Sequence, residues 1–161
     1  MSVRLWRVYN PGFGGDPFDG EGARRVGGRW NSEGVPVVYC SGSLALAVLE
    51  VLVNAKTNLA LVSYLAVSTD VDEKQIERFD ERKLPAEWRQ TPPPYSAQRI
   101  GDGWVTACTS LALEVPSAVI PLEKNYVLNP RHPTFKGLVK SEPIPLPIDP
   151  RLLKREELGR R

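Results

Sequence analysis

The sequence predicts an α+β fold, in which a central sheet with antiparallel or mixed strand pairing is flanked by helices. Short segments at residues 5–9, 35–40 and 59–68 have the alternation or the dense apolar content of strands. The segments 44–54 and 97–110 have the length and apolar spacing of helices. A chain of 161 residues is long enough to bury one core, so residues 1–161 are expected to form a single domain, with 154–161 as a polar tail.

The composition argues against several classes of protein. Hydrophobic residues make up 42% and charged residues 25% of the chain, which is typical of a globular protein rather than a disordered or membrane protein. The formal net charge is only +2, so direct binding to nucleic acid is not expected. No apolar run is long enough to span a membrane, and the N-terminus lacks the apolar core of a secretory signal, so we expect a cytoplasmic protein.

The cysteines and the histidine do not indicate a metal site. Cys40 and Cys108 lie inside apolar segments without CxxC spacing, so they are expected to be buried free thiols. The single histidine, His132, follows a proline in a turn-like segment and is interpreted as a loop side chain rather than a general base. No metal ion is therefore expected.

Residues 10–22 contain five glycines and two prolines, and no regular structure is expected there. Either a binding loop or a disordered connector would fit this composition. The following turn, Gly27-Gly28-Arg29, allows close approach of the backbone to a ligand, and Arg29 offers the planar donors that suit phosphate or carboxylate. Arg25 is a second candidate anion-binding residue, whereas a surface salt bridge is the alternative for Arg29.

The segment after this turn predicts a strand followed by a helix. The strand at residues 35–40 contains Tyr39, and Ser43 is a plausible N-cap for the helix at 44–54. This helix has no polar face and is expected to be buried on most sides, which makes its carboxylate, Glu50, an anomaly. Glu50 is either the partner of a structural arginine or a catalytic or ligand-binding carboxylate. Together with Arg29 and Tyr39, it looks like the wall of an anion-binding pocket.

The remainder of the chain is expected to support this unit. We predict a strand at 59–68, an acidic turn at 70–73, a short strand at 75–79 and a proline-rich surface excursion at 82–95. Ser96 is expected to cap the helix at 97–110. A strand at 111–121 contains Pro116 and then Ser117, whose hydroxyl binds either the backbone or a ligand. An edge strand interrupted by prolines is expected within 138–148, and a frayed helix at the C-terminus.

Four fragments in order resemble the RES-domain family, the toxin half of Xre-RES toxin-antitoxin operons. They are GEGARRVGGRWN, VPVVYCS, ALAVLEVLV and VPSAVIPLEKNYVLNPRHP, and the resemblance runs over about residues 5–153. The family takes its name from an arginine, a glutamate and a serine. The resemblance places these three at Arg29 of the GRW motif, Glu50 of the apolar helix and Ser117 of the VPS motif. It also carries over a fourth position, the tyrosine that ends the next strand, which is Tyr39.

The resemblance implies a fold similar to the ADP-ribosyltransferase toxins and NAD as the substrate, with no separate cofactor. Members cleave the nicotinamide-ribose bond with water or phosphate as the acceptor, and a mono-ADP-ribosyltransferase that modifies a protein is the alternative. An Xre-family antitoxin that covers the active site is the implied partner, and self-association of the toxin within that complex is plausible. A non-catalytic module that binds a nucleotide or a partner is the third hypothesis.

Overall fold

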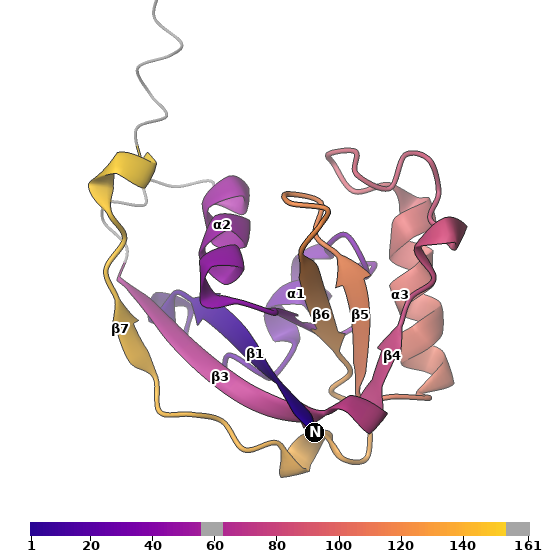
Figure 1. Ribbon diagram of the computed structural model, residues 1–161, viewed down its shortest axis with the longest axis horizontal. Helices are drawn as coiled ribbons and strands as arrows, with labels where there is room; N and C mark the ends of the chain where they lie inside the picture. The colour runs from indigo at the N-terminus through magenta and orange to yellow at the C-terminus, as the bar shows by residue number, and fades with distance from the viewer. Residues whose placement is uncertain (56–62, 154–161) are drawn as a thin grey trace, which may run out of the picture.

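The computed structural model describes residues 1–55 and 63–153 and shows a mixed α+β fold built on one seven-stranded sheet (Figure 1). The strands lie in the order β4-β5-β6-β2-β1-β3-β7. All neighbouring strands pair antiparallel except β4 and β5, which are parallel. Their bounds are β1 Ser2–Tyr9, β2 Val38–Ser41, β3 Tyr64–Asp72, β4 Ile76–Arg78, β5 Ala112–Pro116, β6 Lys124–Leu128 and β7 Ile144–Leu146. The predicted fold class is confirmed.

Three α-helices accompany the sheet in the described part of the chain: α1 Glu21–Val26, α2 Leu44–Asn54 and α3 Tyr95–Ala107. In Figure 1, α2 stands beside β1 and α3 stands beyond β5 and β4, with β6 between the two helices. Single 3-10 turns lie at Pro11–Phe13, Glu73–Gln75, Glu81–Lys83, Phe135–Gly137 and Pro150–Leu153. None of the helices in residues 1–55 and 63–153 is long and apolar enough to cross a membrane.

Alternating residues of the strands divide the core between the two faces of the sheet. On β1, Val8 packs with Ala47 of α2, whereas Leu5 packs with Phe18 of the glycine-rich loop on the other face. On β2, Cys40 belongs to the face of Phe18, and Tyr39 borders the cluster of Trp30 and Trp104. The face with Tyr39 also carries α2 and α3, so it is the face on which candidate site residues from the two halves of the chain can meet.

The helix α2 begins as predicted but is less buried than predicted. Ser43 is the N-cap, and its hydroxyl accepts a hydrogen bond from the backbone N–H of Leu46. Leu46, Ala47 and Leu52 are buried, but Val53 is 39% exposed and Ala45 is exposed. The expectation of burial on most sides was wrong, because α2 covers the sheet with one face and no described residue buries Ala45 or Val53.

Two expectations about local structure near α1 and α3 were also wrong. Residues 20–22 are not all loop, because α1 begins at Glu21 after Gly20, whose φ of 76° is left-handed. Six residues without an apolar stripe give no helical signal in the sequence. Ser96 is not the cap of α3, which begins after Pro94, and its hydroxyl instead donates to Glu87.

Other predicted elements shift rather than disappear. The expected strand at 59–68 overlaps residues 56–62, which lie outside the described residues, and β3 begins at Tyr64. It continues through the expected acidic turn to Asp72, because the strand pairs with the whole length of β1, from Tyr9 opposite Leu65 to Ser2 opposite Asp72. Within this pairing Asp70 forms a bidentate ion pair with Arg4. The strand expected at 111–121 ends at Pro116. The predicted edge strand is confirmed as β7, which pairs with β3 and is last in the strand order of the described residues. The tail 154–161 lies outside the described residues.

The proline-rich connection at 82–95 is more than a surface excursion. Leu84 and Trp88 pack against the core cluster of Trp30, and the rings of Trp88 and Trp30 stack with centroids 5.9 Å apart. This part of the expectation was wrong because a tryptophan in a polar, proline-rich stretch finds its partner in a distant turn.

Helix α3 packs so closely on the turn before β2 that one of its glycines has no room for a side chain. A Cβ at Gly101 would lie 1.6 Å from the carbonyl oxygen of Trp30, whereas a Cβ at Gly103 would meet nothing within 4 Å. We therefore expect Gly101→Ala to lower the free energy of unfolding by about 3 kcal/mol. The matched variant Gly103→Ala should raise it by about 0.5–1 kcal/mol, because alanine favours the helix. Urea unfolding curves test both, and equal effects would contradict this packing.

The two cysteines are free thiols, as predicted, but they differ in burial: Cys40 is buried and Cys108 is half-buried. Burial raises the pKa of Cys40 to about 12. Because the thiolate is the reactive form, iodoacetamide at pH 8 should alkylate Cys108 in the folded protein and leave Cys40 unmodified. Mass spectrometry after labelling with and without urea tests this. Modification of Cys40 at the same rate as Cys108 in the folded protein would contradict it.

Candidate functional site

One oxygen of the Glu50 carboxylate is held by two neutral donors from distant parts of the chain. Oε1 accepts a hydrogen bond of 2.7 Å from the Ser117 hydroxyl and one of 2.6 Å from Nδ2 of Asn125. Glu50 lies on α2, Ser117 directly follows β5, and Asn125 lies in β6. The other oxygen, Oε2, has no hydrogen-bond partner among residues 1–55 and 63–153, and it is not buried from solvent. The carboxylate is therefore fixed at one oxygen and accessible at the other.

Ser117 is fully buried, and its hydroxyl makes the backbone contact that the sequence left open, together with a hydrogen bond to Glu50. Its hydroxyl donates to Glu50 and accepts hydrogen bonds from the backbone N–H groups of Val119 and Ile120. Because the two lone pairs of the hydroxyl accept these bonds, its proton is directed at Glu50. The start of the β5–β6 connection thus orients a single donor toward the carboxylate.

Asn125 was not predicted as a site residue. It faces Ser41 in the register of β2 and β6, and the Ser41 hydroxyl donates a 2.7 Å hydrogen bond to Oδ1 of Asn125. This bond fixes the amide so that Nδ2 points at Glu50. The signal in the sequence is weak. Asn125 lies two residues before Val127, which is buried, so both side chains point to the same face of the sheet. Nothing in the sequence shows which side chain it meets.

Arg29 lies in the turn between α1 and β2 and bridges to the connection before α3. Its Nη1 donates to the backbone oxygens of Trp88 and Gln90. Helix α3 holds the same turn, because Gln98 donates to the carbonyl oxygen of Gly28 and Asp102 accepts from the backbone and hydroxyl of Ser32. The remaining nitrogens of Arg29 have no partner within the described ranges, so donors remain for a ligand.

The charge of Glu50 acts on Arg29 without forming an ion pair. Burial lowers the pKa of Arg29, and the nearby Glu50 carboxylate opposes that change. Neither side chain forms a salt bridge with any of the residues that the structure describes. Both alternatives left open by the sequence, a structural arginine for Glu50 and a surface salt bridge for Arg29, are therefore not found there. The two groups lie in one region with opposite charges held apart.

Tyr39 supports the Arg29 turn with its hydroxyl. The hydroxyl donates a 2.6 Å hydrogen bond to Oδ1 of Asn31 and accepts one from the backbone N–H of Trp30, and burial raises the pKa of Tyr39. A Cβ at Gly28 would lie 2.6 Å from this hydroxyl, so only glycine allows the contact. The hydroxyl is engaged within the protein, which leaves the ring as the part of Tyr39 that a ligand could contact.

Arg25 is not brought to the other four residues by any contact of the described chain. Its side chain is 74% exposed and lies 4.0 Å from Glu21 on the same short helix, α1. His132 likewise stays in its turn, where Nδ1 lies 2.8 Å from the Thr134 hydroxyl. The structure thus gathers Glu50, Ser117 and Asn125 by direct hydrogen bonds, with Arg29 close to them and Tyr39 beneath the Arg29 turn.

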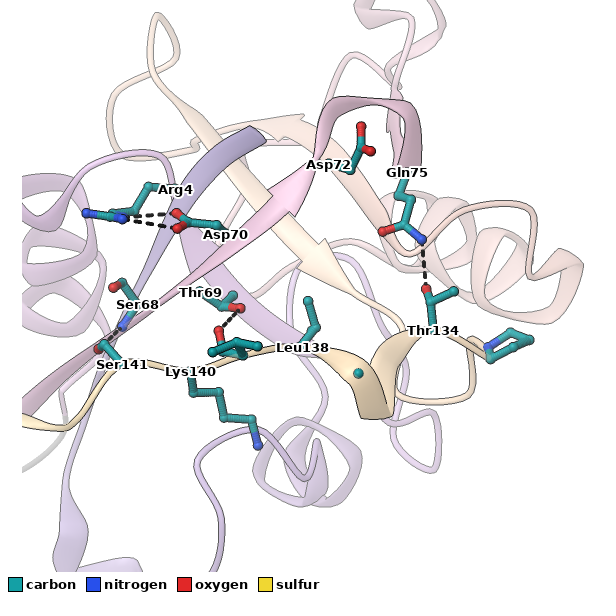
Figure 2. Close-up of a pocket in the computed structure, with 13 residues that line it drawn as sticks. Arg4, Ser68, Thr69, Asp70, Asp72, Gln75, Thr134, Leu138, Lys140 and Ser141 are labelled. Atoms are coloured by element: carbon teal, nitrogen blue, oxygen red, sulfur yellow. Dashed lines mark hydrogen bonds and ion pairs between the residues drawn. The ribbon is translucent and has the colours of Figure 1, made fainter. Parts of the chain in front are cut away.

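A polar hollow of about 820 Å³ lies elsewhere, between β3 and the segment that precedes β7 (Figure 2). It contains none of the predicted site residues. Its charges are already matched, because Arg4 pairs with Asp70, Lys140 pairs with Asp16, and Asp72 caps a 3-10 turn. We therefore place the candidate site at Glu50, where a carboxylate oxygen and several guanidinium donors have no protein partner among the described residues, rather than at this hollow.

The arrangement suits a ligand that carries both kinds of charge. The accessible oxygen of Glu50 can stabilise positive charge that develops nearby, and the remaining donors of Arg29 can bind a phosphate or carboxylate. Neutral donors hold the carboxylate without cancelling its charge.

Comparison with known proteins identifies the family. The RES domain family matches residues 4–149. A curated relative named Toxin Res, from Yersinia enterocolitica, is 34% identical over 151 residues, which cover 93% of this chain and 99% of that protein. A protein named Prs ADP-ribosylating toxin, from Sphingobium sp., is 32% identical over 96% of this chain and 99% of its own length.

The fold is similar to that of a chain in the crystal structure of the MbcT-MbcA toxin-antitoxin complex from M. tuberculosis. The TM-score is 0.75 with 20% identity, and the match covers 91% of this chain and 85% of that chain. The fold and the family match over nearly the same length of sequence. The chain therefore belongs to the RES-domain family of toxins.

Proposed function

We propose that this protein is the toxin of a toxin-antitoxin pair and that it cleaves the bond between nicotinamide and ribose in NAD. The observation that carries the proposal is the Glu50 carboxylate, fixed through one oxygen by Ser117 and Asn125 and accessible through the other. Its charge acts on Arg29, which has no acidic partner among residues 1–55 and 63–153. NAD is the substrate, and the reaction needs no further cofactor.

The chemistry of this bond matches what the residues offer. The ring nitrogen of nicotinamide carries positive charge, so the C–N bond breaks with both electrons leaving on nitrogen, and neutral nicotinamide departs without a strong acid. The ribose is left as an oxocarbenium-like cation, which the negative charge of Glu50 stabilises. An oxygen of water or phosphate then bonds to the anomeric carbon. Water releases a proton to solvent in this step and gives ADP-ribose, whereas phosphate gives ADP-ribose-1″-phosphate.

The other residues bind and orient the substrate. Arg29 binds the pyrophosphate through donors that the protein does not use. The ring of Tyr39 stacks on nicotinamide, while its hydroxyl keeps the Arg29 turn in place. Ser117, which is fully buried, keeps Glu50 in position rather than contacting ribose, because its hydroxyl is already saturated.

A protein acceptor is the second candidate, since a relative 32% identical to this chain is named an ADP-ribosylating toxin. The same cation would then be captured by a side chain of the target. Incubation with labelled NAD, with and without phosphate and cell lysate, distinguishes these outcomes by the product: ADP-ribose, its 1″-phosphate or labelled protein. If nicotinamide is not released under any of these conditions, the proposed reaction is wrong and a non-catalytic binding module is left.

The proposed partner is a small helical DNA-binding antitoxin of the Xre family that covers the site. The support is the structural similarity to a toxin chain crystallised with its antitoxin. Self-association of the toxin within such a complex is part of the same proposal. Co-expression with the adjacent open reading frame, followed by size-exclusion chromatography with light scattering, would reveal both.

The charge of Glu50 can be removed with little change in shape. Glu50→Gln retains the acceptor for Ser117 and Asn125, so it should unfold at the temperature of the native protein and release nicotinamide at least about a hundredfold more slowly. Glu50→Ala and Arg29→Ala should abolish toxicity. Arg29→Ala will also cost some stability, because Arg29 holds the connection at 88–90. Glu123→Gln, an exposed carboxylate on the neighbouring connection, serves as the control and should retain full activity. Full activity in Glu50→Gln would overturn the mechanism.

Asn125 is expected to act by positioning Glu50. Asn125→Ala should lower kcat about tenfold with little change in KM, because it removes one of the two donors that fix the carboxylate. Ser41→Ala, which only frees the Asn125 amide, should lower kcat about twofold to threefold. Steady-state assays of nicotinamide release measure both values. A larger loss in Ser41→Ala than in Asn125→Ala would contradict this order of action.

A further inference from the structure

The connection before α3 carries a second arginine, Arg89, which contacts the residue after Ser117. Arg89 is exposed, and its Nε and Nη2 both donate to the carbonyl oxygen of Ala118, at 3.2 and 3.0 Å. Ala118 directly follows Ser117, which holds Glu50. The guanidinium of Arg89 therefore lies against the connection that positions the carboxylate.

Arg29 holds the backbone on both sides of Arg89. Its Nη1 binds the carbonyl oxygens of Trp88 and Gln90, the two neighbours of Arg89 in sequence. The stacking of Trp88 on Trp30 fixes the same stretch against the residue after Arg29. Two arginines from separate parts of the chain are thus built into one local structure.

Neither guanidinium has an acidic partner among the residues that the structure describes. Arg29 and Arg89 bond only to neutral carbonyl oxygens there, and neither forms an ion pair within residues 1–55 and 63–153. They are close enough for the charge of Arg89 to lower the pKa of Arg29 further, in addition to the larger effect of burial. Like charges held together without a counterion are unfavourable, and a bound anion would relieve that repulsion.

We propose that Arg29 and Arg89 together form a subsite for a diphosphate group, with one guanidinium for each phosphate. The ligand class is a nucleoside diphosphate. The inference rests on the proposed function, in which the pyrophosphate of NAD is the group bound, and it adds Arg89 as a substrate-binding residue. Planar guanidinium groups suit this task because each can donate two parallel hydrogen bonds to one phosphate.

Binding of ADP tests the subsite without requiring any cleavage. Isothermal titration should show that Arg89→Met binds ADP about tenfold to hundredfold more weakly than the native protein. Arg89→Lys retains the charge but loses the paired donors, so its affinity for ADP should lie between those of the native protein and Arg89→Met. Arg82→Met is the matched control: it removes an equal charge from the same connection, but Arg82 is 90% exposed and pairs with Asp80. Its affinity for ADP should stay within about twofold of the native value.

A merely structural role for Arg89 gives a different result. If Arg89 only joins two connections, Arg89→Met should weaken the binding of nicotinamide riboside, which has no phosphate, as much as the binding of ADP. The proposal expects an unchanged affinity for nicotinamide riboside. Equal losses for both ligands, or an affinity for ADP in Arg89→Met within twofold of the native value, would overturn it. Thermal unfolding identifies a variant that fails to fold, and Arg89→Lys then provides the comparison.

The same measurements separate this subsite from the proposed reaction. ADP binding that depends on Arg89, without any release of nicotinamide from NAD, would support the subsite and reject the reaction. Release of nicotinamide with the same KM in Arg89→Met and the native protein would support the reaction and overturn the subsite. A native protein that does not bind ADP at millimolar concentration would also overturn the subsite.

Discussion

The candidate site depends on the pair of hydrogen bonds that hold one oxygen of Glu50. They join α2 to β6 and to the connection after β5, so they require α2 to be docked on the sheet and the strands to be in register. The β2–β6 register sets Ser41 opposite Asn125, and the N-cap at Ser43 starts α2 immediately after β2. A slip of one residue in β6 would turn Asn125 to the other face. The position of the carboxylate is thus a consequence of strand pairing.

Features that could be predicted from the sequence depend on neighbours close in the chain. The bounds of α2 followed from a serine before an apolar run. The edge position of β7 followed from its prolines, which have no backbone N–H to donate to a second neighbouring strand. Glu50 stood out because a lone carboxylate in an apolar helix needs an explanation. Each of these signals lies within a few residues of the feature it predicts.

The features that were missed depend on contacts between distant segments. Asn125 and Glu50 are 75 residues apart in sequence, and neither carries a signal that points to the other. Trp88 lies in a stretch that looks like a surface connection until Trp30 is placed beside it. The glycine at position 101 also depends on a distant contact, since it allows α3 to approach the carbonyl oxygen of Trp30. Such pairings follow from topology, which local propensity does not encode.

The choice of donors around Glu50 argues for a working carboxylate rather than a structural one. A structural glutamate at a half-buried position gains most from a bidentate arginine, which would cancel its charge and occupy both oxygens. Here the donors are a hydroxyl and an amide, both neutral, and both act on the same oxygen. This arrangement fixes the side chain but preserves its negative charge and leaves its second oxygen accessible. Arg29 and Arg89 bind carbonyl oxygens instead of neutralising it, so opposite charges stay separated in one region, as the proposed binding of a ligand that carries both requires.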